Sequence, residues 1–288
     1  MERNIVITAD STCDIGKELT EKYGVVLIPL YAVCGDKAYS DGVDITPEDI
    51  YKYVEESGNL PKTSAVPVGG YEEKFREIVE KGNDIVHISI SNGFSSSYNN
   101  ARLAAESVGH VEVVDSLNLS TGSAHCVIIA AELAKEGLGI KEIKERLDLL
   151  TDKVDASFIL DNLSYLRMGG RCSSVAVLGA NLLKLKPCIE VIDGKMEVGK
   201  KYRGSFESCL KNYIKDRLEG NQDDIDAKRI FVTHTKCNTA ISELAKQEIA
   251  KYMNFDEIIE TEAGCTINCH CGPNTIGILY MRKSKKTK

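Results

Sequence analysis

Near the N-terminus the sequence reads Asn4-Ile5-Val6-Ile7-Thr8-Ala9 and then Asp10-Ser11-Thr12-Cys13-Asp14, a β-branched run followed at once by a polar turn. A buried strand that ends in such a turn is typical of the opening of a β-α unit. Further strand-like runs occur at Val25–Tyr31, Asp84–Ser89 and Val111–Val114, with helical patterns between them. This alternation predicts an α/β fold with a parallel sheet flanked by helices.

The predicted helices carry recognisable start signals and apolar faces. At Thr46-Pro47-Glu48-Asp49, an N-cap threonine precedes a proline at the first helical position and two acidic residues in the first turn. Tyr71–Glu80 has its apolar residues on one face, as expected for an amphipathic helix. Further helices are predicted near residues 97–108, 120–135, 141–151, 206–218 and 238–252.

Polar side chains follow several predicted strands, at Asp10-Ser11, Ser89–Ser97 and Asp115-Ser116. In parallel sheets, ligands bind beyond the carboxyl ends of the strands. Ser, Asp and Asn are also common N-caps, and we expect most of these residues to cap the helices that follow. An N-cap at a strand end can still contribute to an anion site, because free helix N–H groups favour negative charge.

The length of 288 residues is sufficient for two domains. We predict an N-terminal domain of residues 1–152, a linker at Asp152–Asp155 and a C-terminal domain of residues 156–288. The second half opens with a strand at Ala156–Leu160, and Lys186–Met196 contains Asp193-Gly194, a typical two-residue hairpin turn. The C-terminal half is therefore predicted to be a mixed α/β domain.

The segment Val175–Leu185 is almost uninterruptedly apolar. A helix that is apolar all round is usually buried, so a buried helix is predicted here. The small residues Gly179 and Ala180 would leave room for another group alongside it.

The net charge is −7, and the basic tail Arg282–Lys288 contributes five positive charges, so the rest of the chain is more acidic still. An acidic body disfavours broad binding to the phosphate backbone of nucleic acid. We expect the tail to be solvated and frayed, with at most transient contact to an acidic membrane surface.

The sequence also indicates a compartment. No apolar segment approaches the length needed to span a bilayer, and Met1-Glu2-Arg3 runs directly into the first strand without a signal peptide. Ten cysteines scattered through a chain of this length do not resemble a disulfide framework. We therefore expect a protein of the reducing cytoplasm.

A cluster of chemically versatile residues lies near the C-terminus, in Cys269-His270-Cys271-Gly272-Pro273. The Gly-Pro pair predicts a tight bend, and the apolar run Ile276–Met281 predicts a buried strand directly after it. Such a bend would hold His270 in one orientation. The alternative is a turn with an ordinary hydrogen-bonded structural histidine.

A second motif is Leu166-Arg167-Met168-Gly169-Gly170-Arg171. Two glycines allow the backbone to turn closely, which would aim the guanidinium of Arg171 inward. A helix C-cap followed by an exposed arginine explains the same pattern equally well.

These motifs together resemble the DegV family of fatty-acid-binding proteins, whose members include the lipid-carrier subunits of bacterial fatty acid kinases. The resemblance covers nearly the whole chain and rests on seven segments in the expected order. They are Asp10–Asp14, Lys62-Thr63-Ser64, Ile90–Tyr98, Asp115-Ser116, Leu166–Arg171, Leu185-Lys186-Pro187 and His270–Pro273.

The resemblance implies a DegV-like fold of two α/β domains with one long-chain fatty acid as ligand and no cofactor or metal. The carboxylate would be held at the domain junction by Thr63, Ser95, Arg171 and His270, and the acyl tail would be buried in the C-terminal domain. It also implies that the chain is a carrier and not an enzyme. A separate ATP-dependent fatty acid kinase would phosphorylate the carboxylate that this chain presents.

Two other functions compete with that interpretation. The first is a serine hydrolase with Ser95 as nucleophile and His270 as base. Gly93-Phe94-Ser95-Ser96-Ser97 lacks the second glycine of a nucleophile elbow, and no acid is clearly placed to orient the histidine.

The second is a thiol or metal site at Cys265, Cys269, His270 and Cys271. The ligand types suit zinc, but three adjacent residues cannot all reach one ion without strain, and structural zinc sites usually show paired Cys-x-x-Cys spacing. Small buried residues of a strand and turn are the alternative.

Overall fold

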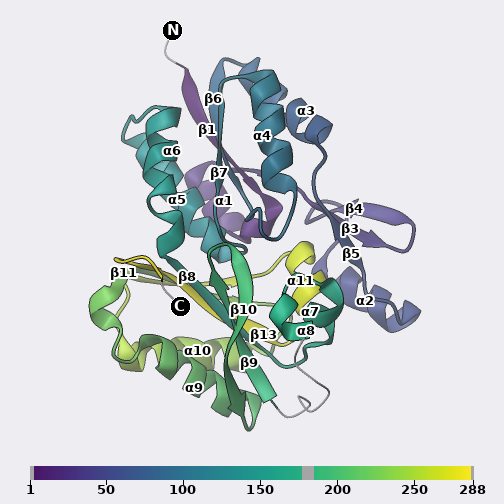
Figure 1. The fold of residues 1–288 in the computed structure, drawn as a ribbon, viewed down its shortest axis with the longest axis vertical. Helices are drawn as coiled ribbons and strands as arrows, with labels where there is room; N and C mark the ends of the chain where they lie inside the picture. Colours follow the sequence, from purple (N-terminus) through teal and green to yellow (C-terminus); the bar gives the residue numbers. More distant parts are fainter. Residues whose placement is uncertain (1–2, 177–184, 287–288) are drawn as a thin grey trace.

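Three β-sheets organise the part of the chain that the structure, a computed structural model, describes: residues 3–176 and 185–286 (Figure 1). The first sheet has four strands, all parallel, in the order β2-β1-β6-β7. Its strands are β1 (Asn4–Asp10), β2 (Val26–Ile28), β6 (Asn83–Ser89) and β7 (Val111–Asp115). This confirms the predicted parallel sheet.

Helices cover both faces of this sheet. Successive side chains of a strand point to opposite faces, and apolar residues on both faces are buried under these helices. In β6, Ile85 packs into a core with Tyr71 and Phe75, whereas Val86 and Ile88 belong to a core on the other side. The flanking helices are α1 (Lys17–Tyr23), α3 (Val68–Val79), α4 (Ser97–Val108), α5 (Thr121–Lys135) and α6 (Ile140–Asp148).

The second sheet has six strands in the order β10-β9-β8-β13-β11-β12. Only β11 and β12 pair in parallel; the other neighbours are antiparallel. Its strands are β8 (Val154–Leu160), β9 (Leu185–Ile192), β10 (Lys195–Arg203), β11 (Ile225–His234), β12 (Glu257–Glu262) and β13 (Thr275–Arg282). The predicted hairpin is confirmed, since Asp193 and Gly194 join β9 and β10 with positive φ angles of 47° and 74°. Helices α9 (Phe206–Leu218) and α10 (Thr239–Tyr252) pack on this sheet.

A third, three-stranded antiparallel sheet was not predicted. It contains β3 (Tyr31–Cys34), β4 (Lys37–Ser40) and β5 (Lys62–Ser64), and α2 (Pro47–Ser57) lies between β4 and β5 in the chain. The predicted single strand Val25–Tyr31 is therefore wrong: the chain leaves one sheet after Ile28 and enters another at Tyr31. Pro29 lies at the break and has no N–H group to donate to a ladder. The predicted helix start is confirmed, with Thr46 and Asp49 forming a reciprocal capping box.

The predicted linker and the predicted frayed tail are both contradicted. Asp155 lies inside β8 and is fully buried, where it forms ion pairs with Arg217, Arg282 and Lys286. Lys286 itself is only 7% exposed. A buried carboxylate requires counter-charges, and the basic tail supplies two of them. Burial alone would raise the pKa of Asp155, but the charges of Arg217 and Lys286 lower it to about 2.

The apolar segment Val175–Leu185 falls mostly outside the described residues. A short helix α7 (Ser164–Gly169) precedes it, and a single turn α8 (Ser173–Ala176) includes its first two residues, of which Val175 is buried. Leu185 begins strand β9 and is not helical. Residues 177–184, with Gly179 and Ala180, are not described, so the predicted helix there stays a prediction. Among the described helices, none combines the length and apolarity that crossing a bilayer requires.

Candidate functional site

The short helix α11 (Cys265–Cys271) places His270 beside strand β5 of the three-stranded sheet, where its ring bonds Thr63. We predicted a turn here, and the helix corrects that expectation, although the predicted bend does follow it. Gly272 ends α11 with φ 67°, and its N–H donates to the carbonyl of Asn268 at 3.0 Å. The helix was missed because seven residues make only two turns, too few for an apolar periodicity to be evident.

Two carboxylates from the N-terminal half hold the first turn of α11. Asp14 Oδ1 accepts from the N–H of Gly264 at 2.8 Å, and Asp41 accepts from the N–H groups of Cys265 and Thr266 at 2.7 and 3.0 Å. These N–H groups have no partner within the helix, so the side-chain oxygens of Asp14 and Asp41 satisfy them. Burial raises the pKa of Asp14 to about 8, in spite of its hydrogen bonds from Ser120 and Gly264.

All four residues predicted to bind a carboxylate line one pocket. Thr63 comes from β5, Ser95 from the turn after β6, Arg171 from the loop after α7, and His270 from the last turn of α11. The structure thus brings together residues that are up to 207 positions apart in the chain. We refer to this set as the polar pocket. Apolar side chains surround it, among them Leu30, Phe94, Leu119, Met196 and Ile267.

His270 and Thr63 are directly bonded, with Nε2 2.8 Å from Oγ1. Burial, and secondarily the charge of Arg171, lowers the pKa of His270 to about 4, so the imidazole is neutral at neutral pH. Its Nδ1 is buried and has no hydrogen-bond partner in the described part of the chain. The alternative prediction was an ordinary structural histidine with its hydrogen bonds made. Only Nε2 of His270 fits that prediction, because Nδ1 has no partner among the described residues.

Arg171 occupies the rim of the polar pocket. It lines the pocket but is exposed, and Nη1 donates to the carbonyl of Gly169 at 2.8 Å. Gly170 terminates α7 in the left-handed region, with φ 67°. The C-cap interpretation of this motif is thus correct, and the guanidinium is not buried as an inward-aimed group would be. It remains close enough to influence His270 electrostatically.

Ser95 is bonded within its own turn. Its Oγ lies 2.9 Å from Oγ of Ser97 and accepts from the N–H of Ser97 at 3.2 Å. A hydrolase would require a nucleophile–base hydrogen bond and a carboxylate on the far side of the imidazole. In the described residues His270 bonds Thr63 and not Ser95, and no acid reaches Nδ1.

The other strand-end residues serve the structure of their loops. Asp10 is buried and accepts from the hydroxyls of Tyr71 and Ser89 at 2.5 and 2.7 Å. Asp115 accepts from the N–H of Leu117 at 2.9 Å. The expectation that most of them are helix N-caps is wrong, since neither α4 nor α5 has a side-chain cap.

The thiols of α11 are buried, and burial raises the pKa of Cys265 and Cys269 and brings that of Cys271 to about 12. A helix places Cys265 and Cys269 on one side, away from Cys271. Within residues 3–176 and 185–286, no three His, Cys, Asp or Glu side chains are grouped as metal ligands.

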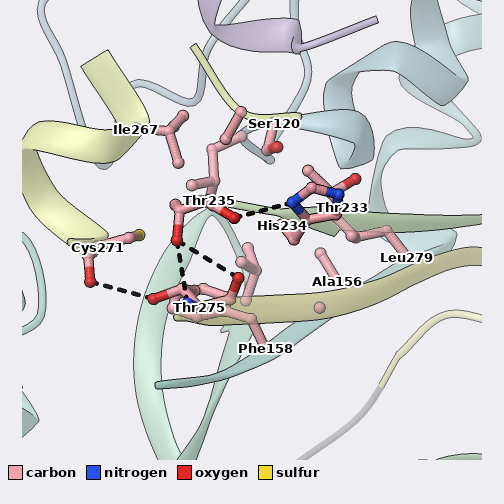
Figure 2. A pocket seen from close by; sticks show the side chains of 14 residues that line it. Ser120, Ala156, Phe158, Thr233, His234, Thr235, Ile267, Cys271, Thr275 and Leu279 are labelled. Carbon is pink, nitrogen blue, oxygen red and sulfur yellow. Dashed lines mark hydrogen bonds between the residues drawn. The ribbon is translucent and has the colours of Figure 1, made fainter. Parts of the chain in front are cut away.

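Figure 2 shows an apolar cavity beside the polar pocket. Leu119, Ile267 and Cys271 line both spaces. Its other walls include Ala156, Phe158, Val191 and Leu279 from the six-stranded sheet. The cavity is narrow, with a volume of about 30 Å³, against about 50 Å³ for the polar pocket. Sequence reasoning missed these strand residues because it placed the tail against residues 175–185.

The hydroxyl groups in the wall of the cavity are already bonded to protein. Thr275 donates its N–H to Oγ1 of Thr235 at 3.0 Å and its own hydroxyl to the carbonyl of Cys271 at 3.1 Å (Figure 2). The surface that remains for a ligand is therefore almost entirely apolar. Together the two spaces form an amphiphilic site with a polar mouth and an apolar interior.

Solved structures of other proteins have the same architecture. The chain superimposes with a TM-score of 0.84 on a DegV lipid-binding protein from Thermotoga maritima, at 28% identity over 98% of this chain and all of that one. It matches a DegV family protein from Thermus thermophilus, described as binding fatty acid, with a TM-score of 0.84 at 29% identity over 96% of this chain and 99% of that one. A stearic-acid-binding protein from Eubacterium ventriosum gives a TM-score of 0.81 at 28% identity, over 96% of this chain and 98% of that one.

Sequence comparison agrees with the structural one. A DegV domain-containing protein of Staphylococcus aureus is 31% identical over 98% of this chain and its own full length. The model of the DegV family, described as a family of uncharacterised proteins, matches residues 4–283. The chain therefore belongs to the DegV family.

Proposed function

We propose that this protein binds one long-chain fatty acid, with the carboxylate in the polar pocket and the acyl tail in the apolar cavity. The observation that carries the proposal is the meeting of Thr63, Ser95, Arg171 and His270 around a mouth that opens into an apolar space. The relatives from Thermus thermophilus and Eubacterium ventriosum, described as binding fatty acids, support the same class of ligand.

The polar pocket offers donors suited to a carboxylate. If Nε2 of His270 carries the imidazole proton, it donates to Oγ1 of Thr63, and the Thr63 hydroxyl is free to donate to the ligand. Ser95 supplies a second hydroxyl, and Arg171 at the rim supplies a positive charge. A carboxylate removed from water without such partners would be strongly disfavoured.

Burial of the acyl tail favours binding, but the apolar cavity is too small for the tail unless it widens. Each buried methylene contributes about 0.8 kcal/mol, so a long chain brings a large driving force. A cavity of about 30 Å³ holds little more than one water molecule. Binding therefore requires the lining side chains to move apart, which uses part of that driving force.

We further infer that the protein is a cytoplasmic carrier and that the chemistry occurs elsewhere. In the described part of the chain His270 bonds Thr63 and Ser95 bonds Ser97, so the imidazole is not placed to activate Ser95 as a nucleophile. Arg171 is exposed at the mouth, so a bound carboxylate would lie close to the surface. A separate ATP-dependent fatty acid kinase could then phosphorylate it in place.

Mass spectrometry of an organic extract from the purified protein tests the proposal. We expect one long-chain fatty acid per chain, or stoichiometric uptake of added oleate by delipidated protein. Absence of lipid in the extract together with no uptake of oleate or palmitate would refute it. Phosphorylation of the bound acid by a partner kinase is a separate assay, which tests only the carrier role.

A further inference from the structure

A second cleft lies away from the fatty-acid site, where α5, the end of β13 and the start of β11 meet the segment that joins the two larger sheets. Its volume is about 460 Å³, far larger than the polar pocket, and it shares no lining residue with that pocket or with the apolar cavity. We name it the basic cleft after its polar lining. Six basic residues line it: His125, Lys153, Lys228, Arg229, Arg282 and Lys283. Among the described residues that line the cleft, Asp226 is the one acidic residue.

Some of these cations already have carboxylate partners. Arg229 pairs with Glu257 at 2.7 Å, Lys228 with Glu132 at 2.8 Å, and Arg282 with Asp224 at 2.8 Å. Arg229 also lies 3.7 Å from Glu132, and Arg282 also pairs with Asp155 at 3.2 Å. N–H groups of both guanidiniums and of the Lys228 ammonium still remain, because a guanidinium has five donors and an ammonium has three.

Two other cations have no carboxylate partner in the described chain. Lys153 pairs with no acidic side chain there, and Lys283 donates its ammonium only to the backbone carbonyl of Asp223, at 3.0 Å. A concentration of positive charge is notable in a protein of net charge −7. The cleft therefore has the charge to attract an anion.

A buried imidazole forms part of the wall. His125 is 2% exposed, and its Nε2 lies 3.1 Å from the carbonyl of Leu279, which can only accept, so Nε2 carries the proton. Nδ1 then holds the lone pair, and it has no hydrogen-bond partner in the described residues. Burial and the charge of Arg229 lower the pKa of His125 to about 4. An anion in the cleft would offset that charge and favour a proton on Nδ1.

We propose that the basic cleft binds a phosphate group. Phosphate carries about −1.5 to −2 charges near neutral pH and presents several acceptor oxygens, which match ammonium and guanidinium donors. The apolar side chains of Ile129, Leu150 and Met281 also line the cleft and would accommodate an organic group attached to the phosphate. Its volume is within the range of about 300–1,000 Å³ usual for small-molecule sites.

The phosphate could belong to a free ion or to the headgroup of an anionic phospholipid, and the experiment separates the two sources. In the first arm, inorganic phosphate is titrated into the full-length protein at constant ionic strength, with chloride as the reference anion, and the imidazole resonances of His125 are followed by NMR. We expect a saturable shift toward the protonated form.

In the second arm, co-sedimentation is compared for vesicles of phosphatidylcholine alone and of phosphatidylcholine mixed with phosphatidylglycerol. Both arms are repeated with Lys153→Gln/Lys283→Gln, which removes the two cations without carboxylate partners. We expect the dissociation constant to rise at least about tenfold. The matched control is Lys74→Gln/Lys81→Gln, which removes the exposed Lys74 of α3 and the exposed Lys81 just after it. Neither lysine lines the cleft, so binding should be unchanged.

Each outcome decides the proposal. Phosphate binding that Lys153→Gln/Lys283→Gln weakens supports a free phosphate, and vesicle binding weakened by the same variant supports a lipid headgroup. The proposal is wrong if phosphate acts no differently from chloride and neither vesicle binds. It is also wrong if the double variant binds as tightly as the control. Fatty-acid content should be equal in both variants, so this result is independent of the fatty-acid proposal.

Discussion

Gly169 and His270 approach so closely that a Cβ atom on residue 169 would lie 2.2 Å from Nδ1 of the imidazole. The first glycine of the Gly-Gly-Arg motif is therefore a packing requirement: helix α7 rests on the ring that faces the polar pocket. The second glycine is favoured by its backbone conformation. Gly170 has a φ of 67°, and a Cβ atom there would meet open space.

We expect Gly169→Ala to displace His270 and lower fatty-acid affinity at least about tenfold, because the ring cannot stay against a methyl group at that distance. Gly170→Ala is the matched control. It should destabilise the protein by only about 1 kcal/mol through left-handed strain and retain the ligand. Displacement of a fluorescent fatty acid measures affinity for both variants. Equal affinity of the two would show that the position of His270 does not matter for binding.

Thr63→Val tests the hydroxyl that His270 contacts. Valine keeps the shape of the side chain but removes the hydroxyl. The free energy of binding should therefore become less favourable by about 1.5–3 kcal/mol, the usual value for a hydrogen bond to a charged group. Thr63→Ser retains the hydroxyl and should bind nearly as well as the wild type. Isothermal titration with oleate distinguishes them, and tight binding by the valine variant would remove Thr63 from the site.

The buried carboxyl of Asp14 makes stability depend on pH. Its pKa is about 8 in the folded protein, whereas an unperturbed aspartate has a pKa of 3.8, so the folded state retains a proton that the unfolded state loses. This contribution is complete below pH 3.8 and is lost as the pH rises through about 8. Asp14→Asn should remove that part of the pH dependence, and urea unfolding from acidic to alkaline pH measures it.

Asparagine suits residue 14 for two further reasons. Its amide can accept from Gly264 and donate to Ser120, and asparagine tolerates the φ of 48° found there. We therefore expect Asp14→Asn to fold and to be at least as stable as the wild type at pH 7. A variant that keeps the wild-type slope of stability against pH would mean that Asp14 is ionised in the folded protein.

His125 makes stability depend on pH in the direction opposite to Asp14. The pKa of His125 is about 4, below the 6.5 of an unperturbed imidazole, so the unfolded state takes up a proton first as the pH falls. Stability should decrease from about pH 6.5 toward about pH 4, by up to a few kcal/mol. His125→Gln should flatten this acid limb, while the exposed His110→Gln should not. Parallel acid limbs for all three proteins would contradict the assignment.

Lys286 is predicted to stabilise the fold although it lies close to the end of the chain. Lys286→Met leaves Asp155 with Arg217 and Arg282 but without a third counter-charge, and should cost about 1–3 kcal/mol. Lys285, 56% exposed in its side chain, is the control: Lys285→Met should change stability by less than about 0.5 kcal/mol. Denaturant unfolding of both variants provides the comparison.

The sequence was informative where elements are long and their signals strong. Helix α9 has the predicted bounds, and the Asp193-Gly194 hairpin and the Thr46 cap are as expected. It was uninformative where structure depends on distant partners. Nothing local shows that Lys286 pairs with Asp155, and the three-residue strand β5 exists only because β3 lies beside it.

The same distinction applies to the site. Resemblance selected Thr63, Ser95, Arg171 and His270, and the fold places all four around one pocket, although their binding role remains a prediction. The sheet residues that line the apolar cavity come from β8, β9, β11 and β13. The two faces of these strands carry similar buried residues, so the sequence does not distinguish them. Only the tertiary arrangement shows which of these side chains face the cavity.

The way α11 is attached restricts how a lipid could enter. Its amide groups are bound by Asp14 and Asp41 from the N-terminal half, while its other end presents His270 to Thr63. Moving α11 away from the N-terminal half would break the hydrogen bonds that its first amide groups donate to Asp14 and Asp41, together with the bond between His270 and Thr63. Loading and release should therefore proceed through a local gap at the surface, with the halves of the molecule remaining joined throughout.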